Sequence, residues 1–253
     1  MFIDTHSHLN FKAFKNDYAQ AIERALNTDV KKIIIPSSNL ETSKKAVKIA
    51  KEYDNIYAAV GLHPIHIKDE DFVEDAFIKL SKSKKVVAIG ETGLDYYHDR
   101  TNAEMQKEVF SKHLKLASRL NLPVIIHCRE AGDDILSILT GQNPLPRGVF
   151  HCFSENWQFA QVVLEMGFYL SFTGIITFTK NQETFEVIQN TPLEKILIET
   201  DSPYLTPESR RGERNEPAYV VEVAKKIAEL KKIPMEEVEN QTTQNAIELF
   251  KLN

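Results

Sequence analysis

The chain has 253 residues, of which 42% are hydrophobic, 26% are charged and nine are glycine. This composition excludes a disordered, collagen-like or coiled-coil protein, and the length suits one eight-fold α/β barrel. The formal net charge of −5 means that the molecule as a whole does not attract polyanions, so a phosphate-bearing substrate has to be held by its binding site.

Short apolar runs rich in valine and isoleucine recur along the chain. They are continuous rather than alternating, which predicts strands buried on both faces, as in a parallel sheet covered by helices. In chain order the eight predicted strands are residues 2–3, 32–35, 57–60, 86–89, 123–126, 148–150, 169–172 and 195–198.

Segments with helical spacing separate these strands, and each is long enough for one crossover connection. The predicted helices are residues 17–26, 42–53, 71–81, 103–120, 134–139, 157–166 and 183–189, followed by 217–231 and 235–250. Eight alternations of strand and helix without a linker-like break favour a closed barrel over an open doubly wound sheet. We therefore predict an α/β fold, a single (β/α)8 TIM barrel domain over residues 1–253.

The segments after six of the eight predicted strands carry a histidine or a carboxylate within a few residues of the strand end. In a parallel barrel the C-terminal ends of all strands meet at one mouth, so residues far apart in the sequence can share a site. His6 and His8 are two positions apart on a predicted strand, which directs both side chains to the same face with chelate spacing.

A single buried histidine is more often an ordinary core residue than a metal ligand. That interpretation weakens when several strand ends carry titratable groups, because without a cation these groups would be desolvated with little to compensate them. Four imidazoles and two carboxylates exceed the needs of one zinc ion, so we expect two ions bridged by Glu91. The predicted metal ligands are His6, His8, Glu91, His127, His151 and Asp201.

Seven motifs, in order along the chain, carry a resemblance to the TatD family of metal-dependent hydrolases. They are DTHSH at 4–8, GLHP at 61–64, GETGLDY at 90–96, IHCR at 126–129, HCFS at 151–154, ETDSPY at 199–204 and RNEP at 214–217. The resemblance implies a barrel with one or two divalent cations and phosphodiester hydrolysis, typically by a deoxyribonuclease acting from the 3′ end. Glu155 is a departure, since the family commonly has glycine there, and a glycine permits a positive φ.

Ligand chemistry suggests roles for the individual residues. We expect His6, His8 and Asp201 to hold one ion and His127 and His151 the other, with Glu91 shared. Imidazole-rich ligation favours Zn²⁺, Mn²⁺, Co²⁺ or Ni²⁺, although Mg²⁺ is possible. Such a pair of ions lowers the pKa of water and polarises a phosphoryl oxygen.

The predicted catalytic residues are Glu91 and Asp201, with Asp201 as the base. The predicted substrate-binding residues are His63, Tyr96, Arg129 and Arg210, which fall in or near the strand-end loops. Asp95 has an ordinary explanation as a turn-forming residue. The site suits DNA strand ends or short oligonucleotides better than a long duplex, which needs many phosphate contacts.

Two alternatives stay open at this point. The same ligand chemistry suits a hydrolase of a carbonyl ester or amide, and D-aminoacyl-tRNA is a substrate of that kind compatible with the family. A catalytically quiet metal-binding or partner-binding protein is the other alternative, and the complete ligand set argues against it.

Only two cysteines are present, which is no disulfide framework. Cys128 and Cys152 each follow a predicted ligand, and strand alternation sends neighbouring side chains to opposite faces. We therefore expect both to pack as small hydrophobic residues between the barrel and its helices. The apolar runs are too short to span a membrane and no secretory signal is visible, so we expect a cytoplasmic protein.

Overall fold

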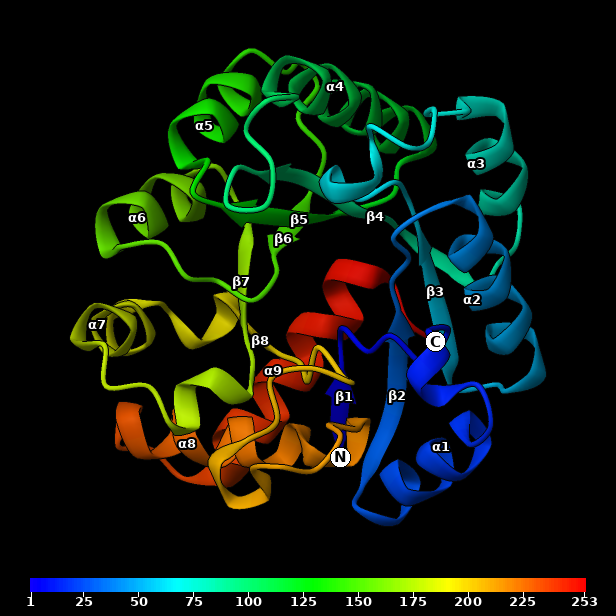
Figure 1. The fold of residues 1–253 in the computed structure, drawn as a ribbon. Helices are drawn as coiled ribbons and strands as arrows, with labels where there is room; N and C mark the ends of the chain where they lie inside the picture. Colours follow the sequence, from blue (N-terminus) through cyan, green and yellow to red (C-terminus); the bar gives the residue numbers. More distant parts are fainter.

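The computed structural model describes residues 1–253, and it contains one eight-stranded parallel sheet whose strands lie in sequence order. The strands curve into a nearly closed barrel (Figure 1). This confirms the predicted TIM barrel. The strands are β1 (Phe2–Asp4), β2 (Val30–Ile35), β3 (Ile56–Val60), β4 (Val86–Asp95), β5 (Val124–Arg129), β6 (Gly148–Phe150), β7 (Tyr169–Phe172) and β8 (Ile196–Ile198).

Helices α1 to α8 surround the strands (Figure 1), and α9 lies close to β1 and β8. No helix combines the length and apolarity needed to cross a membrane. The helices are α1 (Tyr18–Asn27), α2 (Leu40–Glu52), α3 (Glu74–Ser81), α4 (Ala103–Leu120), α5 (Gly132–Thr140), α6 (Trp157–Glu165), α7 (Gln182–Asn190), α8 (Val220–Lys231) and α9 (Met235–Phe250).

Helix α2 begins two residues earlier than the sequence pattern predicts. The Asn39 side chain accepts a hydrogen bond from the Thr42 amide at 2.9 Å, and the Thr42 hydroxyl accepts one from the Asn39 amide at 2.9 Å. This reciprocal capping box satisfies two amides that a helix start otherwise leaves unpaired.

Strand β4 extends to Asp95, six residues beyond its predicted end. Its register against β5 is irregular between Ile89 and Thr92, and then continues to the pairing of Asp95 with Arg129. Gly93 makes this close pairing possible, since its φ is +139° and a Cβ there would overlap the carbonyl oxygen of His127. The extension places the residues after Ile89 on a strand instead of in a loop.

The apolar residues of the strands divide between two cores. Residues such as Ile33 and Ile35 face the surrounding helices, whereas Ile34 belongs to a separate cluster inside the barrel. Leu249 and Phe250 of α9 pack into this inner cluster. The resulting alternation along β2 is the two-residue period of a strand with helices on one face and the barrel interior on the other.

Helix α9 closes the amino-terminal end of the barrel. The Asn245 side chain donates hydrogen bonds to the carbonyl oxygens of Leu193 at 2.8 Å and Ile196 at 2.7 Å, at the start of β8. The amino-terminal end is thereby covered, whereas the histidines and carboxylates lie at the carboxyl ends of the strands.

Barrel closure between β1 and β8 continues beyond both strands. The Thr5 amide donates to the Ile198 carbonyl at 3.2 Å, and Ser7 and Ser202 form a parallel bridge. The Asp201 amide donates to the carbonyl of His6 at 2.8 Å. The segments that carry the first predicted histidines and Asp201 therefore lie side by side.

His113 on α4 supports the segment that follows β3. Its Nε2 accepts a hydrogen bond from the Leu62 amide at 3.0 Å, while Nδ1 donates to the Val109 carbonyl at 2.8 Å. The ring is fully buried, and burial lowers the pKa of His113 from 6.5 to about 4. Below pH 6.5 the unfolded chain binds a proton that the folded chain does not bind until about pH 4.

We expect the stability that depends on neutral His113 to be complete above pH 6.5 and to be lost as the pH falls toward about 4. The loss in the free energy of unfolding approaches roughly 3 kcal/mol, because each unit of pKa shift corresponds to about 1.4 kcal/mol. In His113→Gln, the glutamine oxygen accepts from Leu62 without titrating, so the free energy of unfolding falls less steeply on acidification. Urea denaturation of the metal-free proteins measures this difference, and an identical pH dependence of the two proteins would contradict it.

Candidate metal centre

Glu91 lies at the centre of the predicted ligand group. Its Oε1 is 2.7 Å from His151 Nε2, 3.0 Å from His127 Nδ1 and 3.1 Å from His63 Nε2. Its Oε2 is 3.4 Å from His6 Nε2 and 3.7 Å from His8 Nε2. One carboxylate thus directs its two oxygens toward two separate sets of imidazoles.

Asp201 completes the set on the Oε2 side of Glu91. Its Oδ1 is 3.3 Å from His8 Nε2 and 3.5 Å from His6 Nε2, and the two Nε2 atoms are 3.2 Å apart. His6 and His8 thus direct their Nε2 atoms to the same place, although both residues lie beyond the end of β1 and not on the strand as predicted. The pairing with the segment after β8 keeps this stretch of backbone extended.

The spacing of these atoms fits a cation. Ligands bound at about 2.1 Å to one tetrahedral ion lie roughly 3.4 Å from each other. The distances among the His6, His8 and Asp201 atoms are 3.2 to 3.5 Å. On the other side, His127 Nδ1 is 3.1 Å from His151 Nε2. The donor set, rich in imidazole with carboxylates, is that of Zn²⁺ and its first-row neighbours.

His63, which was predicted to bind substrate, lies directly beside the candidate metal ligands. Together with Glu91 and His127 it forms a set whose donor atoms lie within 4.8 Å of each other. Its side chain is only 9% exposed. This position makes His63 a further candidate ligand, on the side of Glu91 where the sequence had placed only His127 and His151.

The carboxylates of the centre are held in their ionised form. Burial raises the pKa of Glu91, but the surrounding imidazoles of His151, His63 and His127 outweigh it and hold the pKa well below its ordinary value. Burial likewise opposes ionisation of Asp201, whose pKa is nevertheless lowered by His8 and His6. Both groups are therefore anionic at neutral pH, as cation ligands must be.

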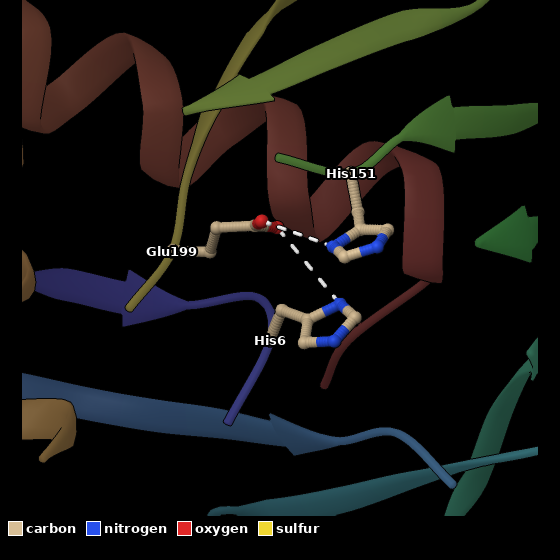
Figure 2. A group of neighbouring side chains, drawn as sticks. All are labelled: His6, His151 and Glu199. Carbon is tan, nitrogen blue, oxygen red and sulfur yellow. Dashed lines mark hydrogen bonds and ion pairs between the residues drawn. The ribbon is translucent and has the colours of Figure 1, made fainter. Parts of the chain in front are cut away.

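Glu199 lies beside the Nδ1 atoms of two of the histidines, His6 and His151 (Figure 2). Its Oε1 is 3.3 Å from His151 Nδ1, and its Oε2 is 4.0 Å from His6 Nδ1. The carboxylate is fixed by the Ser171 hydroxyl, which donates at 2.6 Å, and by the Cys152 amide, which donates at 2.8 Å. The Nε2 atoms of both imidazoles are thereby left to face Glu91.

No separate role was predicted for Glu199 from the sequence, although its spacing from Asp201 is the same as that between His6 and His8. The signal available was its position directly after a predicted strand, two residues before Asp201. That position does not indicate which histidine rings the carboxylate reaches, because His6 and His151 come from distant strands.

Asp95 performs a similar function for His127. Its Oδ2 is 3.0 Å from His127 Nε2 and 2.8 Å from His98 Nδ1. Its Oδ1 also accepts a hydrogen bond from the His98 amide at 2.9 Å, which is the turn-forming contact expected from sequence. Asp95 therefore combines a turn with a contact to the outer nitrogen of His127.

The predicted substrate-binding residues Arg129 and Tyr96 differ in exposure. The guanidinium carbon of Arg129 lies 3.9 Å from the ring centre of Tyr97, which is 58% exposed. The Tyr96 ring is buried, and its hydroxyl donates to Asp134 at 2.6 Å. Tyr96 and Tyr97 differ in exposure because strand pairing continues beyond Asp95, where the Tyr96 amide donates to the Arg129 carbonyl. Neighbouring side chains of a paired strand point to opposite sides.

Arg210 lies farther along the chain, in the 3-10 helix Glu208–Arg210. Its guanidinium carbon is 5.2 Å from the ring centre of Tyr219, and its Nη1 is 3.9 Å from Glu213 Oε1. The side chain is exposed, with a neighbouring carboxylate that partly neutralises its charge.

Glu155, which stands where the family commonly has glycine, does not adopt a positive φ in the loop after β6. The residue with positive φ there is Cys152, at 45°. The Glu155 side chain instead accepts a hydrogen bond from the Cys128 thiol at 3.4 Å. Cys128 packs against the outer core as predicted, whereas Cys152 contacts the Thr173 hydroxyl at 3.6 Å.

Comparison with known proteins gives consistent results over the full chain. A family model described as TatD related DNase matches residues 3–251. The metal-dependent hydrolase YabD of Bacillus subtilis is 44% identical over 100% of both chains. YcfH of Escherichia coli K12, also a metal-dependent hydrolase, is 37% identical over 99% of this chain and 96% of its own.

Among solved structures, the TatD homologue YjjV of Escherichia coli K12 superposes with a TM-score of 0.93 at 33% identity. The match covers 100% of this chain and 98% of YjjV.

Replacing Glu199 by glutamine tests the orienting contacts. Glutamine keeps the size of the side chain but removes the charge that faces both Nδ1 atoms, so we expect affinity for Zn²⁺ or Mn²⁺ to fall about 10- to 100-fold. Competition with a chromogenic chelator measures this change. Glu194→Gln, an exposed residue in the 3-10 helix Leu193–Lys195, is the matched control. Equal affinity of the two variants would exclude the orienting role.

Proposed function

This chain belongs to the TatD-related DNase family of metal-dependent hydrolases, and from that premise we propose that it is a divalent-metal-dependent phosphodiesterase that cleaves DNA from the 3′ end. The proposal rests mainly on the way the two carboxylate oxygens of Glu91 face different sets of histidines. Its Oε2 faces His6 and His8, while its Oε1 faces the imidazoles of the opposite set. A bridging carboxylate of this kind is typical of two-metal sites that act on phosphate esters.

Two sets of residues divide the binding of the cations. In this proposal His6, His8 and Asp201 hold one ion, and His127 and His151 hold the other with His63 beside them. Glu91 serves both sites. Bound cations would supply electrophilic activation of the phosphodiester and of the attacking water.

Asp201 is suited to accept the proton of the attacking water. Its side chain is 15% exposed, compared with 5% for Glu91, so a substrate at the mouth reaches Asp201 more readily. The neighbouring imidazoles of His8 and His6 keep its carboxylate ionised. Glu199 has no such access, because it is buried behind the histidines.

Arg129 and Tyr97 offer a contact surface for the substrate at the end of β5. A guanidinium binds a phosphate oxygen pair well, and the exposed Tyr97 ring presents a face to a base. Tyr96 contributes by fixing the turn through Asp134. Arg210 is assigned to a more distant phosphate of the substrate, since its side chain is exposed.

Asp201→Asn removes the proton acceptor while keeping one oxygen ligand. We expect kcat to fall by at least about 100-fold, because a positioned general base contributes 10²- to 10⁴-fold. Asp54→Asn, an exposed residue at the amino-terminal end of β3, is the control and keeps full activity. Metal content is measured in parallel by mass spectrometry, and a variant that retains both metal and kcat would show that Asp201 is not the base.

The substrate class is tested with metal-reconstituted protein and single-stranded DNA labelled at its 5′ end. We expect a ladder of progressively shorter labelled products that disappears when a chelator is added. An oligonucleotide blocked at its 3′ end is the control, and uniform cleavage of it would contradict action from that end.

A simple carboxylic ester and a D-aminoacyl-tRNA are assayed alongside the DNA. Hydrolysis of either one with the DNA left intact would establish the carbonyl hydrolase and reject the phosphodiesterase. Absence of turnover for every substrate, with metal bound, would favour a catalytically quiet metal-binding protein.

A further inference from the structure

A groove of about 680 Å³ opens beside the candidate metal centre. Residues 10–13 and Lys15 form one side of it, and the beginning of α2 forms another. Tyr204, three residues after Asp201, contributes an aromatic ring that is 53% exposed.

Phe11 connects this groove to the metal centre. Its ring stacks on His8 with the ring centres 4.1 Å apart and an angle of 16° between the planes. The Tyr204 ring approaches the same histidine edge-on, at 6.5 Å. The groove therefore borders the side of the centre formed by His8 and Asp201, because Phe11 and Tyr204 belong to its lining and lie against His8.

Three lysines line the groove, and none of them takes part in an ion pair of the molecule. They are Lys12, Lys15 and Lys45, and Glu41 is the single carboxylate among the lining residues. Three ammonium groups against one carboxylate leave a local excess of two positive charges, in a chain whose net charge is −5. The groove is thus a locally cationic feature on an anionic molecule.

Lys45 shows that these charges are close enough to interact. Its ammonium donates only a long hydrogen bond, of 3.5 Å, to the Phe11 carbonyl. Burial lowers the pKa of Lys45, and repulsion from Lys15 lowers it further, with partial compensation from Glu41. An anion placed between these ammonium groups would relieve the repulsion.

We propose that this groove binds the sugar-phosphate backbone of a single-stranded nucleic acid, with Lys12, Lys15 and Lys45 contacting its phosphates and Tyr204 stacking on a base. A cationic groove with exposed aromatic rings is the general design of sites for single strands. Several separate ammonium groups and a volume of about 680 Å³ exceed what one free phosphate requires.

The direction of the strand follows from the proposed function, on which this inference rests. If hydrolysis proceeds from the 3′ end, the scissile bond at the metal centre lies next to that terminus. The remainder of the strand then extends on the 5′ side of the scissile bond. The groove would hold these nucleotides, so its contribution increases with the length of the substrate.

The test uses the triple variant Lys12→Gln/Lys15→Gln/Lys45→Gln. Its matched control is Lys44→Gln/Lys48→Gln/Lys51→Gln, which changes the net charge equally on the exposed face of α2, away from the groove. Both are prepared with and without Asp201→Asn, and folding is verified by circular dichroism. Single lysine variants are measured as well, so that the result does not depend on one triple variant folding.

Binding is measured without turnover, in the Asp201→Asn background. Fluorescence anisotropy with a labelled single strand of about ten nucleotides gives the Kd as a function of salt concentration. We expect the groove variant to bind about tenfold more weakly than the control at moderate salt. Its slope of log K against log salt is expected to be shallower by about 2, since each lost phosphate contact removes roughly 0.7.

Turnover is measured with the variants that retain Asp201, using the same strand and a dinucleotide as substrates. We expect the ratio of kcat/KM for the strand to that for the dinucleotide to fall about tenfold in the groove variant and to stay constant in the control. Equal salt slopes and equal ratios in the two triple variants would overturn the groove inference while leaving the phosphodiesterase intact. Failure of the unmodified protein to cleave either phosphodiester would instead overturn the proposed function, and the salt slopes would still decide whether the groove binds the strand.

Discussion

A buried carboxylate that five imidazole rings approach from two sides is the constraint on which the rest of this molecule depends. Glu91 is almost fully buried, so water cannot compensate its charge. Its two oxygens meet different histidines at distances of 2.7 to 3.7 Å. This closeness is costly for a group of charges without a cation, and it is the spacing that the ligands of a bound divalent cation adopt.

The architecture keeps this group in place by separating it from the apolar core. Helix α9 fills the amino-terminal end of the barrel with Leu249 and Phe250, and the inner cluster occupies the middle. The histidines and carboxylates of the centre lie at the carboxyl-terminal ends of the strands. The carboxylates Glu199 and Asp95 then fix the outer nitrogens of His151 and His127, so that the inner nitrogens converge.

Different residues flank the candidate metal centre in the groove next to His8 and at the end of β5. Lys12, Lys15 and Lys45 line the groove together with Phe11 and Tyr204, whereas Arg129 stacks on Tyr97 at the end of β5. Under the proposed function, a polymer at the centre would meet positive charge and aromatic rings at both of these places. A small ester would contact only the centre. Substrate length would therefore decide how many of these flanking residues contribute to binding.

The sequence by itself determined the barrel and most of the residues that meet at its mouth. The reason is that burial on both faces of a strand and helical spacing are local patterns, and that a parallel barrel brings every strand end to one place. From this rule alone, His6, Glu91 and Asp201 could be assigned to one group although they come from different parts of the chain.

Tertiary structure decided how these residues are arranged. The extension of β4 past Gly93 fixed which side chains face inward, so that Tyr97 is exposed in place of Tyr96. Contacts between strands distant in sequence placed Glu199 behind two histidines and brought His63 to Glu91. Such contacts depend on the register of neighbouring strands and on the closure of β1 against β8, and no local pattern in the sequence specifies either.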